Sequence, residues 1–325
     1  MHPAFSVIFL TTLIGAGQGL FLALFTAQTY AAFDLLPAQT GPGFYGPGSL
    51  LALAFLAAGL LASFFHLGRP ERAWRAATQW RTSWLSREVI VLPAFMGTVF
   101  LYGLAHWLDW RPVLLVLPSG LPVDPTAVLG VAGTVLAFLL FVCTGMVYAC
   151  LRFLREWHTP LTVINFVLLG GASGFTLAAG LAAVAAPALV PFFAGWAAII
   201  TFLGLVGRGA SLWRNRRLRP GSTVQSAIGV KHPRIVQRSQ GFMGGSFNTR
   251  EFFHGRTGAW LKGVKWGFLL AAFVVPTLLL GAGTAGGVGG ALFVFIVQYA
   301  GLIAERWYFF AEANHPQNLY YRSMA

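Results

Sequence analysis

The densest group of polar and aromatic side chains lies between positions 66 and 88. It combines an imidazole, a carboxylate, arginines and indoles, of which we single out His66, Arg69, Trp84, Arg87 and Glu88. A quinone that gains or loses two electrons also moves two protons, so its site needs proton-exchanging groups and a route to water. An imidazole titrates near neutral pH and can shuttle a proton, and a carboxylate can relay that proton or fix the imidazole tautomer. The cluster therefore favours quinone binding and proton transfer.

The positions of these residues suggest how they meet. One apolar run ends just before His66 and the next begins just after Glu88, so we expect the two side chains to face each other at one membrane interface. Arg69 or Arg87 would keep Glu88 ionised. A structural alternative exists for each residue, because Glu88 would suit a helix N-terminus, the arginines can snorkel, and Trp84 suits an aromatic belt. The residues taken together favour function.

Two weaker polar clusters follow. Tyr148, Arg152, Glu156 and His158 leave an apolar run on the same side, and we interpret them as structural. In the third cluster, we expect Glu305 and Arg306 to form a local ion pair. The polar residues that follow, Glu312, Asn314 and His315, would belong to a tail that faces a partner.

The histidines and cysteines of the chain do not have the spacing that haem or metal binding requires. A cytochrome b type subunit needs facing histidines inside the bundle, but the seven histidines fall at run ends, in loops or near the termini. Cys143 and Cys150 lie in one apolar run without Cys-x-x-Cys spacing. We therefore expect no haem, no iron–sulfur cluster and no metal site in this chain, and we assign it no catalytic residue.

The elements that position these residues are long apolar runs. Hydrophobic residues make up 57% of the 325 residues and charged residues 10%, whereas a soluble domain is near 25% charged. Runs of this length in a bilayer must be helices, because the backbone has to satisfy its own hydrogen bonds. The sequence thus predicts an all-α integral membrane protein, a single-domain eight-transmembrane-helix bundle over residues 1–325. The expected spans are Ala4–Tyr30, Ser49–Phe65, Val89–Trp107, Val128–Cys150, Leu161–Val184, Leu189–Val206, Val264–Leu280 and Val288–Phe310.

The charges fall on one side of this arrangement. With eight spans, 21 of the 22 Lys and Arg residues share a side, and only Arg111 lies opposite, beside Asp34, Asp109 and Asp124. The positive-inside bias makes the basic side cytoplasmic and places both termini there. The formal net charge of +13 then reflects topology, and we expect no nucleic-acid partner.

Two further patterns concern loops and packing. Residues 207–262 are predicted to form a basic cytoplasmic loop, in which Arg214, Arg216 and Arg217 would dock a partner or lie on anionic headgroups. Both alternatives stay open. Small residues at four-residue spacing predict close helix contacts, and the pairs are Gly15/Gly19, Gly170/Gly174 and Gly286/Gly290.

Four segments resemble the membrane anchor of the dimethyl sulfoxide reductase type of molybdoenzyme. They read HLGRPERAWRAATQWRTSWLSRE from His66, YACLRFLREWHTPLT from Tyr148, KHPRIVQRSQGFMGGSFNTREFFHG from Lys231, and ERWYFFAEANHPQNLYY from Glu305. The last three look most like the anchor of the cytoplasm-facing, sulfite-oxidising branch. The resemblance implies a haemless anchor subunit in which His66 and Glu88 handle quinol.

The same resemblance implies partners and a reaction. A four-cluster ferredoxin-like iron–sulfur subunit and a molybdopterin catalytic subunit would sit on the anchor. The anchor would lie in a bacterial inner membrane, hold no molybdopterin itself and exchange electrons with ubiquinone or menaquinone. Oxidation of sulfite to sulfate is favoured, because the main cluster and the long loop are both expected on the cytoplasmic side. The alternatives are the anchor of a dimethyl sulfoxide reductase that oxidises menaquinol, and a passive scaffold without a quinone site. A transporter is disfavoured, because the spans carry few midplane polar residues beyond Gln18, Asn165 and Gln298.

Overall fold

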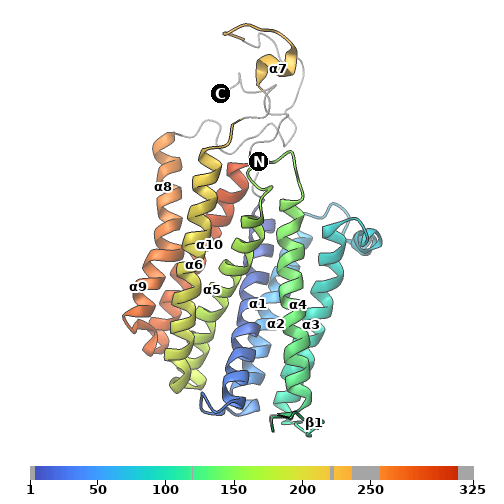
Figure 1. Cartoon of the computed structure of the whole chain (residues 1–325), viewed down its shortest axis with the longest axis vertical. Coiled ribbons are helices and arrows are strands. Elements are labelled where there is room, and N and C mark those ends of the chain that lie inside the picture. Colours follow the sequence, from blue (N-terminus) through green and yellow to red (C-terminus); the bar gives the residue numbers. More distant parts are fainter. Residues whose placement is uncertain (1–3, 119, 220–222, 236–256, 314–325) are drawn as a thin grey trace.

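The computed structural model describes residues 4–118, 120–219, 223–235 and 257–313. Eight of its helical segments are long and apolar enough to cross a membrane, and they form one elongated bundle (Figure 1). The spans are α1 Phe5–Ala32; η1 Gly41–Tyr45 with α2 Gly46–Phe64; α3 Trp84–Trp107; α4 Pro125–Ala149; α5 Pro160–Ala185; η3 Pro187–Leu189 with α6 Val190–Arg216; α8 Gly258–Leu269 with the π turn η5 Leu270–Val274 and α9 Val275–Gly281; and α10 Val288–Glu312.

The connections between the spans contain short elements. These are the 3-10 helix η2 Pro70–Gln79, the strands β1 Leu115–Val116 and β2 Pro122–Val123, the helix α7 Val224–Ile228 and the 3-10 turn η6 Thr284–Gly286. The two strands pair antiparallel in a small hairpin between α3 and α4. All eight predicted spans coincide with observed helices, so the expected all-α membrane bundle is confirmed, with this hairpin as its small exception.

Three predicted span boundaries are wrong in ways that matter. Helix α3 begins at Trp84 rather than at Val89, because the Ser83 Oγ caps it by accepting from the Ser86 N–H at 3.3 Å. Glu88 therefore lies inside the helix rather than at its start. Helix α6 continues to Arg216, since Arg208 and Ser211 are buried against neighbouring helices, and α8 begins at Gly258. The predicted loop over residues 207–262 is thus shorter at both ends.

Helices α1 and α5 are the most buried of the spans and cross at small residues. A Cβ atom on Gly174 would collide with the backbone of Gly19, and one on Gly19 would collide with the carbonyl of Gly170. The predicted close contacts at Gly15/Gly19 and Gly170/Gly174 are therefore confirmed. Gly286 instead lies in the turn η6, so the third glycine pair joins no two spans.

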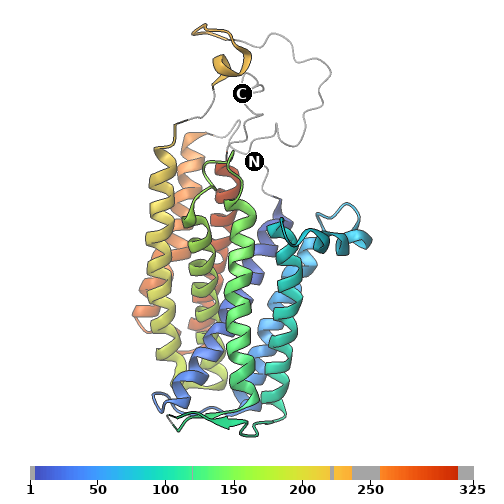
Figure 2. The ribbon, with the colours of Figure 1, turned by 45° about the vertical axis from the view of Figure 1, so that its right-hand side comes forward.

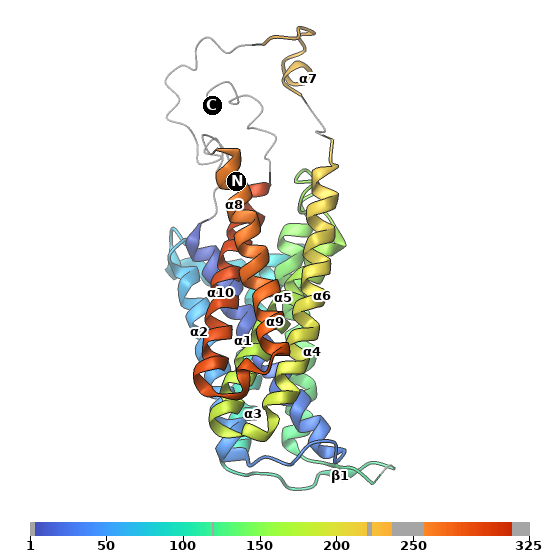
Figure 3. The same ribbon diagram turned by 90° about the vertical axis from the view of Figure 1, so that its left-hand side faces the viewer.

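The bundle has two chemically different ends. The start of α1 and the end of α10 lie at the same end as η2 and α7, and we call this the basic end (Figure 1). The β1–β2 hairpin marks the opposite end (Figures 1 and 3). Helix η2 projects sideways from the bundle near the basic end (Figure 2).

Candidate functional site

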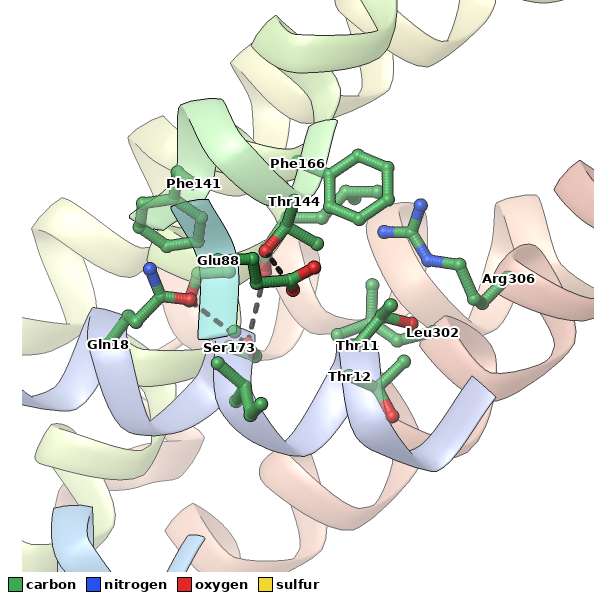
Figure 4. Close-up of a pocket in the computed structure, with 14 residues that line it drawn as sticks. Thr11, Thr12, Gln18, Glu88, Phe141, Thr144, Phe166, Ser173, Leu302 and Arg306 are labelled. Atoms are coloured by element: carbon green, nitrogen blue, oxygen red, sulfur yellow. Dashed lines mark hydrogen bonds between the residues drawn. The ribbon is translucent and has the colours of Figure 1, made fainter. Parts of the chain in front are cut away.

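Glu88 points from α3 into the bundle. The Thr144 hydroxyl of α4 donates to Glu88 Oε1 at 2.6 Å, and within the described part of the chain the carboxylate has no ion-pair partner. It faces a small cavity, the Glu88 cavity, which is closed by α1, α4, α5 and α10 (Figure 4). Glu88 is thus a carboxylate inside a span, held by a single hydroxyl.

The Glu88 cavity is polar and has a volume of about 20 Å³. Its lining includes Thr11, Thr12, Gln18, Ser173 and Arg306, and the Arg306 guanidinium points toward it (Figure 4). A polar cavity of this size holds about one water molecule. It has no room for a quinone ring.

His66 lies apart from this cavity. It follows the end of α2, its side chain is exposed, and it is absent from the cavity lining. Partial desolvation lowers the pKa of the imidazole below its usual 6.5, which favours the neutral form. Arg69 is exposed in the same loop. The structure therefore does not bring His66 and Glu88 together in the facing pair that the sequence predicted.

Arg87 and Trp84 shape the start of α3. Arg87 Nε donates to the Trp80 carbonyl at 2.9 Å and Nη2 donates to the Arg81 carbonyl at 2.8 Å, while the guanidinium carbon lies 4.2 Å from the centre of the Trp84 ring. The Arg87 side chain thus ties the end of the η2 loop to α3 rather than pairing with Glu88. The structure shows no contact between Glu88 and either Arg69 or Arg87. It therefore does not support the expectation that one of these arginines keeps Glu88 ionised.

A buried charge cluster lies beside the Glu88 cavity, and the sequence analysis missed its member Arg208, which it placed in a loop. Arg208 Nε of α6 is 2.7 Å from Glu305 Oε1 of α10, and Arg208 Nη2 is 3.7 Å from Glu312 Oε2. Arg306 Nε is 3.9 Å from Glu305 Oε2, so the expected local pair of these two neighbours is the looser contact. The sequence analysis ended this span with the apolar run. The signal it overlooked was the helical periodicity by which Arg208 and Ser211 continue α6.

The cluster at the end of α4 is mainly structural, as predicted. Tyr148 packs among aromatic rings, with Trp157 and Phe309 at centroid distances of 5.3 and 5.7 Å. The His158 Nδ1–H donates to the Ala149 carbonyl at 2.6 Å, and Arg152 is exposed. Glu156 differs, because it lines a second cavity beside Arg208 and Glu305.

The three arginines assigned to partner docking have different surroundings. Arg214 Nη1 donates to the Arg155 carbonyl at 3.0 Å and Nη2 donates to the His158 carbonyl at 3.2 Å, so Arg214 ties α6 to the α4–α5 loop. Arg216 and Arg217 are exposed. The predicted partner-facing residues Asn314 and His315 lie outside the described residues.

A second network, at the opposite end, surrounds His106. The Tyr102 hydroxyl donates to Gln28 Oε1 at 2.7 Å, and His106 Nε2 is 3.3 Å from the same oxygen. Arg111 Nη2 is 3.2 Å from His106 Nδ1, and a guanidinium can only donate. Nδ1 therefore accepts, and Nε2 carries the proton that is donated to Gln28. His106 uses both nitrogens to join α1, α3 and the loop that follows.

Comparisons with known proteins agree with this architecture. The sequence model of the family described as "DMSO reductase anchor subunit (DmsC)" matches residues 1–233. A protein from Allochromatium vinosum, named as a subunit of sulfite dehydrogenase, is 59% identical over 326 aligned positions, which cover 100% of both chains. The similarity therefore includes α8 to α10, which lie beyond the family match.

Proposed function

Because the chain belongs to the family of dimethyl sulfoxide reductase membrane anchors, we propose that it exchanges electrons between a partner iron–sulfur subunit and membrane quinone during sulfite oxidation. The relative from Allochromatium vinosum, whose name assigns it to sulfite dehydrogenase, supports sulfite as the substrate of the complex. A molybdopterin catalytic subunit removes two electrons from sulfite, and the iron–sulfur subunit passes them to quinone. The quinone is ubiquinone or menaquinone, and it takes up two protons to become quinol.

The observation that carries this proposal is Glu88. An ionisable side chain inside a membrane span is costly, and such residues commonly mark proton or substrate pathways. Glu88 has a hydroxyl partner and faces a water-sized polar cavity, a setting that lets a carboxylate exchange a proton.

The quinone ring binds outside the Glu88 cavity, because that cavity is too small for it. His66 and the neighbouring Phe65, whose side chain is 87% exposed, offer a proton-exchanging imidazole and an apolar face at the end of α2. The lowered pKa of His66 makes a neutral imidazole available near pH 7. In this arrangement His66 contacts the ring, Arg69 lies at the surface beside it, and Glu88 exchanges protons through water. Trp84 and Arg87 hold the start of α3 in position.

The basic end faces the cytoplasm of a bacterium in this proposal. The positive-inside bias supports that orientation, since the basic side chains gather there and Arg111 lies at the opposite end. Exposed Arg216 and Arg217 extend α6 at the same end, where a soluble iron–sulfur subunit would dock.

The test uses the purified complex of the anchor with its two partners. Glu88→Gln and His66→Ala are each expected to lower turnover with quinone about 100-fold, the lower end of the range for loss of an acid–base group. Sulfite oxidation with a soluble dye acceptor and assembly of the complex should stay unchanged. Glu71→Gln, an exposed carboxylate in η2, is the matched control. Unchanged quinone kinetics in both variants would refute this site.

The family description supports a second candidate, in which the complex reduces dimethyl sulfoxide and draws electrons from menaquinol. The direction of flow distinguishes the two. The proposed function requires sulfite-dependent reduction of quinone by the complex, whereas the alternative requires sulfoxide-dependent oxidation of menaquinol. A passive scaffold would show neither, and a quinone-site inhibitor would not affect it.

A further inference from the structure

Three charged side chains are buried together between α5, α6 and α10. Arg208 is 2% exposed, Glu305 1% and Arg306 4%. Removing charges from water is costly, and a single close pair such as Arg208–Glu305 at 2.7 Å compensates only its own two members. Arg306 adds a third charge, so a simple structural ion pair does not account for the cluster.

Several polar atoms of this cluster lack hydrogen bonds to protein. Within the described residues, Asn165 Oδ1, Glu305 Oε2 and Arg306 Nε are buried without a hydrogen-bond partner. Buried polar atoms of this kind are usually satisfied by ordered water. The second cavity, lined by these three residues and by Glu156 and Arg208, has a volume of about 10 Å³, near the size that one water needs.

The second cavity and the Glu88 cavity share a wall. Arg306 and Phe166 line both of them, and the Arg306 guanidinium carbon lies 3.8 Å from the centre of the Phe166 ring. Figure 4 shows the guanidinium directed toward the side of the Glu88 cavity. A guanidinium has five N–H donors, so one Arg306 can hold water in both cavities.

The other end of the cluster approaches the basic end of the bundle. Glu312 is the last residue of α10, its side chain is 16% exposed, and its Oε2 lies 3.7 Å from Arg208 Nη2. Glu156, in the α4–α5 loop, lines the second cavity from the same end. Glu312 thus lies beside Arg208 at the basic end, Glu305 lines the second cavity, and Glu88 lines the cavity beyond Arg306.

We propose that this chain of groups delivers protons from the basic end of the bundle to Glu88, an inference that rests on the proposed function. Glu312 takes up protons at the basic end, and Glu305 with water in the two cavities carries them to Glu88. Arg208 and Arg306 keep their protons and orient the carboxylates and the water. For each quinone reduced, two electrons come from the iron–sulfur subunit, two protons come from this side, and two O–H bonds form. Every carboxylate returns to its starting state.

The test compares Glu305→Gln with Glu305→Asp in the assembled complex. The Gln variant cannot carry a proton, so turnover with quinone should fall at least 10-fold and its solvent deuterium isotope effect should rise. The Asp variant keeps a carboxylate and should retain most of the turnover. Dye-linked sulfite oxidation should not change in either variant. Glu312→Gln should slow quinone turnover in the same direction, and Glu71→Gln should match the parent complex.

Glu305→Gln leaves Arg208 buried without its carboxylate and can therefore impair folding. A second variant distinguishes such a folding defect from a loss of proton transfer. Replacing both partners, by Arg208→Met with Glu305→Met, removes this one ion pair as a unit, and such a replacement commonly preserves stability. This double variant should assemble into the complex, but its turnover with quinone should remain slower than that of the parent complex. Normal quinone turnover in it, or in Glu305→Gln, would overturn the proton route. If Glu88→Gln remains slow in that case, the proposed function stands; if Glu88→Gln and His66→Ala are also normal, both fall.

Discussion

Glu88 and Glu305 are both carboxylates inside spans, and their neighbours give them different properties. Glu305 lies 2.7 Å from a buried guanidinium, which stabilises its charge. Glu88 has the Thr144 hydroxyl at 2.6 Å and no cation within ion-pair distance in the described chain. Glu88 is therefore suited to hold a proton, whereas Glu305, beside its guanidinium, would only pass one on.

For His66, we expect a pKa below 6.5, because partial burial disfavours the charged imidazolium. As pH falls, the imidazole should stay neutral to a lower pH than a fully hydrated histidine does. Titration of the histidine Cε1 resonance by NMR in isotope-labelled complex measures this value, and loss of that resonance in His66→Gln assigns it. A midpoint at or above 6.5 would contradict the prediction.

The His106 network allows a prediction about stability. Tyr102→Phe removes a buried hydroxyl that donates to Gln28 Oε1 at 2.7 Å, so we expect a loss of about 1 kcal/mol. Thermal unfolding in detergent measures the change. The control is Tyr45→Phe, because Tyr45 stacks on His106 at 4.5 Å without a hydroxyl hydrogen bond to the described residues. Equal effects of the two changes would show that the hydrogen bond contributes little.

At the scale of elements, the contact between α1 and α5 depends on the absence of side chains. Small residues let two helices approach closely, and the backbone atoms then gain van der Waals contact. Gly174 meets the backbone of Gly19, whereas Gly180, on the same helix, has open space around the position of a Cβ atom. These two glycines of α5 form a matched pair.

Gly174→Ala should therefore destabilise the bundle by about 1–3 kcal/mol, the usual cost of overpacking. Gly180→Ala should be neutral or slightly stabilising, since alanine is the better helix former. Both variants can be compared by thermal unfolding of the purified protein in one detergent. A Gly174→Ala variant as stable as Gly180→Ala would mean that the helices do not cross at this position.

At the scale of the whole molecule, the segregation of charge implies an orientation. The basic end should face the cytoplasm and the β1–β2 hairpin should face outward. Single cysteines at Gln79, in η2, and at Leu114, before β1, test this, because both side chains are exposed. Cys143 and Cys150 are first replaced.

A membrane-impermeant maleimide applied to intact cells, with the outer membrane permeabilised, should label Leu114→Cys and spare Gln79→Cys. Lysed cells should show labelling of both, which controls for reactivity. Labelling of Gln79→Cys from outside would reverse the orientation and separate the proposed site from a cytoplasmic partner.

The spans could be predicted because bilayer crossing is a property of local composition: each helix satisfies its own backbone, whatever its neighbours. The predicted helix boundaries were wrong where polar residues, which suggest a loop, belong to a helix. The polar composition around Arg208 predicts a loop. Helix α6 nevertheless continues through Arg208, because Glu305 lies opposite it in the bundle, although Glu305 comes about a hundred residues later in the chain. No local rule supplies that partner.

The sequence by itself determined the eight helices, the charge asymmetry and the presence of His66 and Glu88 near one end, since these follow from residue type and chain order. Only the tertiary structure decided that Glu88 faces Thr144 and Arg306 rather than His66, and that Arg87 turns back to the Trp80 and Arg81 carbonyls. The direction of a side chain depends on helix phase and on which helices pack together. Those properties are set by contacts across the whole bundle.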